Sequence, residues 1–216
     1  MDQSMKSTNE GPDPAATAAA AIQDPALFLE LIEGIKAPAG TARYACEKSL
    51  RIISESRPEL LYPYFDVFAE LLDHKNSFLK WGGIVIIANL TPVDVDRRFD
   101  RLFRKYYAPI RGPVMITAAN IIGASAKIAA CRPDLAGRIA REILKVETAE
   151  YIHGNKPSPE CRRVAIGAAI STFSQIYDLV PDRKRVREFV RRQLTNPRKS
   201  VAKAAAGFMK KHSASA

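Results

Sequence analysis

One spacing of residues recurs five times along this chain and restricts its fold more than any other feature. Each copy has an apolar or small residue at its first position, a small residue four positions later and an apolar residue four positions after that. The copies begin at Ala42, Leu79, Val114, Cys161 and Val201. Intervals of 37, 35, 47 and 40 residues separate these starts. Such periods are typical of solenoids built from two helices per repeat.

The spacing within a copy predicts a helix that turns one face toward its neighbours. Residues four and eight positions apart lie on the same side of an α-helix, and a small middle residue allows another helix to come close. In the second copy these residues are Leu79, Gly83 and Ile87. Glycine is unfavourable inside a helix without a specific reason, so we expect close helix packing at Gly82 and Gly83.

Caps and turn residues divide the chain into ten expected helices, which form five pairs. Proline at position 63 predicts a bend near the start of the third helix. No alternating strand pattern appears, and residues 147–160 are expected to form a long loop. The expected helices cover about residues 24–36, 41–56, 57–72, 77–90, 93–107, 113–130, 133–146, 158–176, 181–194 and 198–209.

The domain organisation follows from composition. Residues 1–23 are rich in Ser, Thr, Gly, Pro and Ala and have few large apolar groups, so we expect a disordered tail. Residues 24–212 are expected to form one α-solenoid. Residues 213–216 are expected to be a frayed tail.

At this level the chain resembles the HEAT/armadillo-type helical repeat family. The resemblance is strongest in LTNPRKSVAKAAAGFM (residues 194–209) and NSFLKWGGIVII (residues 76–87). It implies an all-α fold, a right-handed α-α superhelix of about five helix pairs. It also implies that the second helix of each pair lines a concave face on which partners bind.

The second position of the repeat pattern carries a basic residue in three copies, at Arg43, Lys80 and Arg162. In the family that this chain resembles, such a residue often ties neighbouring repeats through an aspartate in a turn, so a structural ladder is one interpretation. The third and fifth copies depart from the pattern, because Met115 and Ala202 stand at this position.

A second interpretation is a partner-binding groove on the concave face. A tryptophan close to arginine and tyrosine has the composition of interaction hot spots. If Trp81 is not simply a core residue, it would lie in such a groove. The expected groove residues are Tyr44, Lys80, Trp81, Arg162 and Arg163.

The charge of +10 is unevenly distributed. Residues 1–96 carry 14 Asp and Glu against 8 Lys and Arg, whereas residues 181–216 carry 11 Lys and Arg against 2 acidic residues. Arginines at positions 183, 187 and 191 form one helical stripe, which could neutralise phosphates. The alternatives are a solvated face on the terminal repeat or contact with the acidic part of a second copy. The candidate patch contains Arg183, Arg187, Arg191, Arg192, Arg198, Lys199 and Lys203.

Several function classes are disfavoured. No apolar run reaches the roughly 18–20 residues that a membrane span needs. The first residues lack the pattern of a secretory signal, so a cytoplasmic location is expected. Cys46, Cys131 and Cys161 are widely separated, which favours buried free thiols over disulfides or zinc ligands. We expect neither a metal nor a cofactor.

No catalytic motif was found. Asp94, Asp96 and Asp100 cluster at a predicted helix start, where carboxylates act as caps. Some HEAT-like proteins are DNA glycosylases for alkylated purines, but no carboxylate accompanies Trp81 on its expected helix. The sequence therefore favours a non-enzymatic scaffold for a protein partner. Nucleic-acid binding is the alternative, and glycosylase activity is the least favoured reading.

Overall fold

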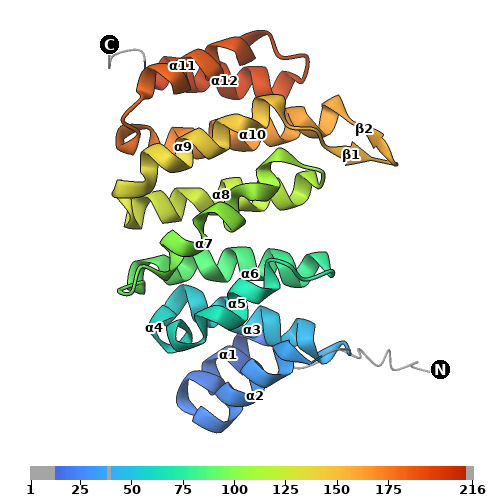
Figure 1. Cartoon of the computed structure of the whole chain (residues 1–216), viewed down its shortest axis with the longest axis vertical. Coiled ribbons are helices and arrows are strands. Elements are labelled where there is room, and N and C mark those ends of the chain that lie inside the picture. Colours follow the sequence, from blue (N-terminus) through green and yellow to red (C-terminus); the bar gives the residue numbers. More distant parts are fainter. Residues whose placement is uncertain (1–12, 38–39, 213–216) are drawn as a thin grey trace, which may run out of the picture.

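The computed structural model describes residues 13–37 and 40–212 and is an all-α solenoid. Helices follow one another in pairs along the long axis of the molecule, from α1–α3 at one end to α11–α12 at the other (Figure 1). The α-helices are α1 (Pro14–Gln23), α2 (Pro25–Lys36), α3 (Ala42–Ser56), α4 (Pro58–Leu61), α5 (Phe65–Leu71), α6 (Ser77–Leu90), α7 (Arg98–Tyr107), α8 (Met115–Cys131), α9 (Ala136–Leu144), α10 (Pro159–Ile176), α11 (Arg183–Arg192) and α12 (Lys199–Lys211).

The second helices of the pairs stack directly on one another. Contacts run from α3 to α6, from α6 to α8, from α8 to α10 and from α10 to α12. We call this the ladder layer. The other layer, made of α2, α4–α5, α7, α9 and α11, covers one side of it. We call the side of the ladder layer that faces away from these helices the open face (Figure 1).

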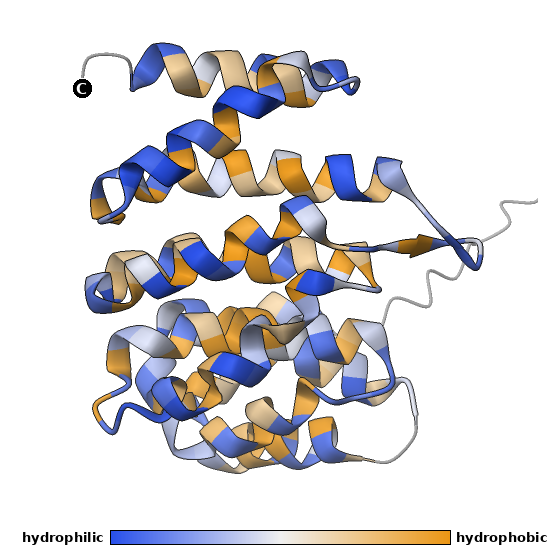
Figure 2. Ribbon diagram, turned by 45° about the horizontal axis from the view of Figure 1, so that its top comes forward, coloured by the Kyte–Doolittle hydropathy of each residue, from blue (hydrophilic) through white to orange (hydrophobic). Residues whose placement is uncertain are grey.

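The core lies between the two layers and is one continuous cluster. Apolar residues gather where the helices meet, whereas α11 is mostly hydrophilic (Figure 2). Two tyrosines of α7 show how the layers are joined, because the Tyr106 hydroxyl donates to the Ile84 carbonyl of α6 and the Tyr107 hydroxyl contacts Ser125 of α8. Within the described residues, no helix is long and apolar enough to cross a bilayer.

Close packing at the glycine pair of α6 is confirmed. A Cβ on Gly83 would lie 2.7 Å from the Leu71 Cβ and 3.1 Å from the Phe68 carbonyl oxygen. A Cβ on Gly82 would collide with the carboxylate of Glu47 on α3. Gly83 is bounded by a Cβ and a backbone oxygen of α5, so glycine allows α6 to approach that helix, whereas the neighbour of Gly82 is the end of the Glu47 side chain.

The expectation of disorder for residues 1–23 is wrong over α1, while residues 1–12 lie outside the described part of the chain. The Asp13 carboxylate accepts hydrogen bonds from the first-turn N–H groups of Ala15 and Ala16, both at 3.2 Å. Alanine has the highest helix propensity, and the buried Ala18 and Ala21 give α1 a thin face that packs on α3. A search for large apolar groups alone does not reveal such an alanine-based face. The tail predicted at residues 213–216 also lies outside the described residues.

Two other segments differ from the prediction. The segment expected to be a plain loop contains a short antiparallel hairpin, β1 (Ile152–His153) and β2 (Lys156–Pro157). Its two-residue turn has positive φ at Gly154 and Asn155, +55° and +61°, which suits a tight hairpin.

The fifth expected helix begins at Arg98 rather than near residue 93. The Asp94 carboxylate accepts from the N–H groups of Arg98 and Phe99, at 2.8 and 2.9 Å, so its predicted capping role is confirmed.

The predicted bend at Pro63 is also confirmed. A short 3₁₀ segment, Tyr62–Tyr64, separates α4 from α5. Similar 3₁₀ segments follow or precede other helices, namely Thr91–Val93, Ala108–Arg111, Pro133–Leu135, Lys145–Thr148, Tyr177–Leu179 and Gln193–Thr195.

Candidate binding surfaces

Large apolar side chains are exposed at the N-terminal ends of α6 and α8. Phe78 is 66% exposed and Ile116 is 47% exposed. The half-buried Trp81 joins the two helices, because its ring packs edge-on against Phe78 at 5.4 Å and its indole N–H donates to the hydroxyl of Thr117, the residue after Ile116, at 3.0 Å. We call Phe78, Trp81 and Ile116 the apolar strip.

Two more exposed apolar residues, outside the apolar strip, belong to the segments around the start of α8. Val114, which precedes α8, is exposed. Ile152 of the hairpin is also exposed, and its N–H donates to the Pro113 carbonyl at 2.9 Å. This bond holds the projecting hairpin (Figure 1) beside the start of α8. Sequence reasoning selected Trp81 for a groove but not Phe78, Ile116 or Ile152. It also placed Val114, the first residue of the third copy, on an inward face, whereas the structure exposes Val114 just before α8.

Tyr44 of α3 also lies near the start of α6. Its hydroxyl accepts a hydrogen bond from the Asn76 side chain at 2.9 Å, and the Arg43 guanidinium lies over its ring. Asn76 caps α6 by accepting from the N–H groups of Phe78 and Leu79. Tyr44 thus contacts the turn that positions the apolar strip.

Two of the three predicted groove cations, Arg162 and Arg163, lie on α10, whereas Trp81 and Lys80 lie on α6. Arg163 forms an ion pair with Glu160 at 3.2 Å on its own helix. Arg162 lines a pocket of about 190 Å³ at the base of the hairpin, together with Tyr151 and Ser158. Over the described part of the chain, neither Lys80 nor Arg162 forms an ion pair.

A ladder of charges exists elsewhere, at the turns that join the two layers. Arg132 donates to Asp100 at 3.0 Å and to Asp134 at 2.8 Å. Arg97 bridges the same two carboxylates. One pair earlier in the chain, Arg98 pairs with Asp66 at 2.8 Å. Successive repeats are therefore tied by arginines that the repeat pattern does not include.

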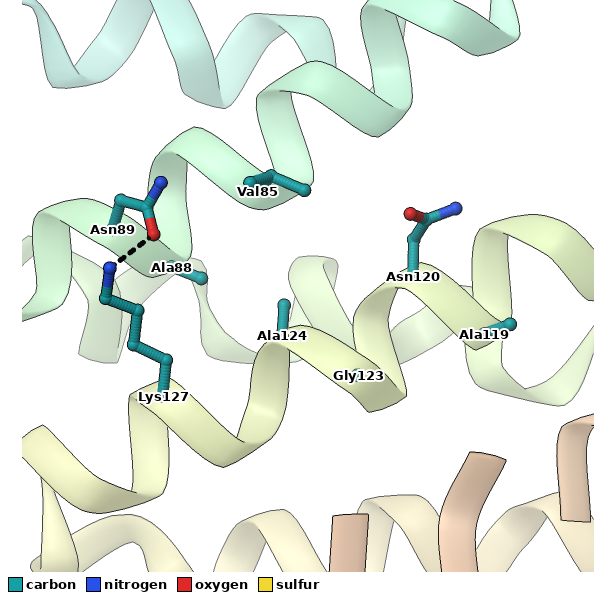
Figure 3. Close-up of a pocket in the computed structure, with 8 residues that line it drawn as sticks. All are labelled: Val85, Ala88, Asn89, Ala119, Asn120, Gly123, Ala124 and Lys127. Carbon is teal, nitrogen blue, oxygen red and sulfur yellow. Dashed lines mark hydrogen bonds between the residues drawn. The ribbon is translucent and has the colours of Figure 1, made fainter. Parts of the chain in front are cut away.

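A groove of about 370 Å³ lies on the open face between α6 and α8 (Figure 3). Its walls are mostly small and apolar, and its polar groups are Asn89, Asn120 and Lys127. The lining residues are Val85, Ala88, Asn89, Ala119, Asn120, Gly123, Ala124 and Lys127. A volume of this size is within the usual range of ligand pockets.

The cation of the groove is held in place by a chain of hydrogen bonds. Lys127 Nζ donates to Asn89 Oδ1 at 2.7 Å, and Asn89 Nδ2 donates to Ser54 Oγ at 2.8 Å. Asn89 and Ser54 are buried. Lys127 itself is exposed and has no carboxylate partner in the ion pairs of the described residues. Its ammonium group is therefore fixed in position with hydrogen-bonding capacity to spare.

One carboxylate of α3, the helix next to α6, is buried. Glu47 is 7% exposed and packs against Gly82, with Arg51 Nε at 3.5 Å. Burial raises the pKa of Glu47, and the nearby charges of Arg51 and Lys48 oppose that rise only in part. Because α6 covers the Glu47 carboxylate, this group lies inside the solenoid rather than on its surface.

The seven predicted anion-binding cations divide into two groups. Three are engaged within the molecule: Arg183 donates to the Asp178 carbonyl, Arg192 makes two hydrogen bonds to Glu147, and Arg198 pairs with Glu160. Four form no ion pair among the described residues, namely Arg187, Arg191, Lys199 and Lys203. The prediction of buried free thiols is wrong about burial: all three cysteines are free, but Cys131 is exposed and Cys46 and Cys161 are only half-buried. No potential metal-binding group of three or more His, Cys, Asp or Glu occurs in the described chain.

Comparisons with known proteins add one structural likeness. No protein-family model matches the chain. No curated protein matches it either. A solved structure of a designed armadillo repeat protein aligns with 84% of this chain and 98% of its own chain, with 12% sequence identity and a TM-score of 0.30.

Proposed function

We propose that this protein is a non-enzymatic scaffold that binds a protein partner on the open face of the ladder layer. One observation carries the proposal: Phe78 and Ile116 are exposed near the starts of two helices that Trp81 joins through its ring contact with Phe78 and its hydrogen bond to Thr117. Contiguous exposed apolar groups mark interaction sites, and tryptophan is enriched among residues that dominate binding energy. The strip stands on rigid helices, so little ordering would be required on binding.

The test compares protein capture by three immobilised forms of the full chain. The strip variant is Phe78→Ser with Ile116→Ser. The matched control is Leu29→Ser with Val95→Ser, which removes two exposed apolar residues elsewhere. A partner retained by wild type and control but lost by the strip variant supports the proposal. Equal recovery on a folded strip variant would contradict it.

Nucleic-acid binding is a second candidate. It is favoured by four cations of the last helix pair that form no ion pair within the described part of the chain, Arg187, Arg191, Lys199 and Lys203. Such a patch would bind phosphates without sequence preference. The engagement of Arg192 by Glu147 and of Arg198 by Glu160 makes it smaller than the sequence suggested.

A further inference from the structure

On the open face, the neighbouring helices α6 and α8 each carry a large apolar residue near the start and a polar residue nearer the end. On α8, the exposed Ile116 near the start is followed 11 positions later by Lys127. On α6, Phe78 is followed 11 positions later by Asn89. Eleven residues are slightly more than three full turns, so each pair lies on one side of its helix. Both helices therefore present a large apolar group at one end of the groove and a polar group at the other.

The space between these ends can admit a polypeptide chain. Small residues line the middle of the groove, including Ala119, Gly123 and Ala124, and Gly123 has open space where a Cβ would lie. Asn120 donates its side-chain N–H to the Ile116 carbonyl of its own helix at 2.9 Å. Its side-chain oxygen faces the groove region shown in Figure 3 and is available to accept from a main-chain N–H.

Lys127 is the feature that selects the chemistry of the partner. The Asn89–Ser54 chain positions its ammonium group over the groove, yet the described chain supplies no carboxylate to it. Only one of its three hydrogens is used by Asn89. A fixed cation with unused donors is complementary to a carboxylate, because hydrogen bonds between two charged groups are stronger than neutral ones.

We infer that the partner is an extended acidic segment whose Asp or Glu carboxylate pairs with Lys127 while a large apolar residue rests on the apolar strip. The inference rests on the proposed function of the open face. The rise of a helix places Lys127 about 16 Å beyond Ile116, and an extended chain covers about 3.3 Å per residue. The acidic residue therefore lies about five positions from the apolar one in the partner.

The experiment selects ligands from a phage-displayed library of random 12-residue peptides, using the full chain as bait. Wild type is expected to enrich peptides that combine a large apolar residue with Asp or Glu about five positions away. The same selection on Lys127→Glu should lose this acidic preference. The strip variant, Phe78→Ser with Ile116→Ser, should retain few or none of the enriched peptides.

One enriched peptide is then synthesised with its acidic residue or with the matching amide. Changing Asp or Glu to the amide should weaken binding to wild type roughly tenfold, as expected for the loss of a charged hydrogen bond. Lys127→Met should weaken the acidic peptide equally and leave the amide peptide unaffected. Lys184→Met, an exposed lysine on α11, is the matched control and should change neither affinity. The peptide change leaves the protein intact, so folding defects cannot explain its effect.

The outcomes separate this inference from the proposed function. Peptides that need the apolar strip but bind Lys127→Met as tightly as wild type would overturn the acidic-partner inference and leave the binding surface standing. Failure to select any strip-dependent peptide would count against both.

Discussion

Two glycines in ladder helices have opposite surroundings, although sequence alone treats both as unfavourable residues inside a helix. Gly83 of α6 is pressed against Leu71 and Phe68, whereas the Cβ position of Gly123 in α8 meets open space. The prediction of close packing at Gly83 came from the repeat pattern and was right. The pattern gave no reason for Gly123, which lies outside its fixed positions.

Gly83→Ala is expected to lower the free energy of unfolding by about 1–3 kcal/mol, because the added methyl group overpacks a site bounded by backbone. Gly123→Ala should instead raise it by up to about 1 kcal/mol, since alanine favours the helix. Urea unfolding followed by circular dichroism measures both. Equal effects of the two changes would refute the packing account.

The buried carboxylate of Glu47 gives a pH prediction. Its pKa is raised on folding by burial, so the folded protein holds this proton more tightly than the unfolded chain. The free energy of unfolding should therefore fall as pH rises from the ordinary pKa of glutamate through the raised one, and then level off.

Glu47→Gln removes this loss and should be more stable than wild type near neutral pH, with the difference shrinking below about pH 4.3. Thermal melts across this range test it, with the exposed Glu55→Gln of the same helix as control. A neutral-pH melting temperature below that of wild type would mean that the contact with Arg51 outweighs the cost of burial.

At the scale of elements, the arginines at the turns form contacts between neighbouring repeats, and the spacing of residues within one copy does not predict such contacts. The repeat pattern offered a ladder at Arg43, Lys80 and Arg162 as one interpretation. Lys80 and Arg162 form no ion pair among the described residues, and the observed ties between repeats run through Arg97, Arg98 and Arg132. Long side chains reach across to the next repeat, so their partners depend on the offset between neighbouring pairs. That offset is a property of stacking and is absent from the spacing within one copy.

Arg132→Met should lower the free energy of unfolding by about 1–3 kcal/mol, because Asp100 and Asp134 lose a shared, largely buried donor. Arg101→Met on α7, an exposed arginine outside the described ion pairs, should change it by less than about 0.5 kcal/mol. Chemical unfolding of both variants at two salt concentrations is the measurement. A loss of similar size in both would show that the charge ladder does not join the repeats.

Helix pairs were predictable because their signals are local: the periodicity of apolar residues, aspartate and asparagine caps, and prolines at first turns. Helix α1 was missed since its packing depends on alanines, whose burial needs the surface of α3. The hairpin was missed because only two residues pair in each strand. In the candidate site, Trp81 could be chosen by residue type, whereas the exposure of Phe78 and Ile116 emerges only from stacking.

For the whole molecule, the uneven charge distribution leads to a prediction about nucleic acid. If the last helix pair binds phosphates, duplex DNA or RNA should bind weakly near 50 mM salt and dissociate toward 200 mM. Arg187→Glu with Arg191→Glu should abolish that binding. Fluorescence anisotropy with labelled duplexes tests it, and no binding by wild type at low salt would assign the patch to solvation of the terminal repeat.

The central claim is that the apolar strip is the partner-binding surface, and Trp81 reports on it directly because it is the single tryptophan of the chain. Its emission should be recorded while a captured partner, or a selected peptide without tryptophan, is added to wild type, to Phe78→Ser and to Leu29→Ser. Our account predicts a saturable blue shift in wild type and Leu29→Ser, because binding removes water from the indole, and a much weaker response in Phe78→Ser. Binding that calorimetry detects in wild type without any change in Trp81 emission would contradict it.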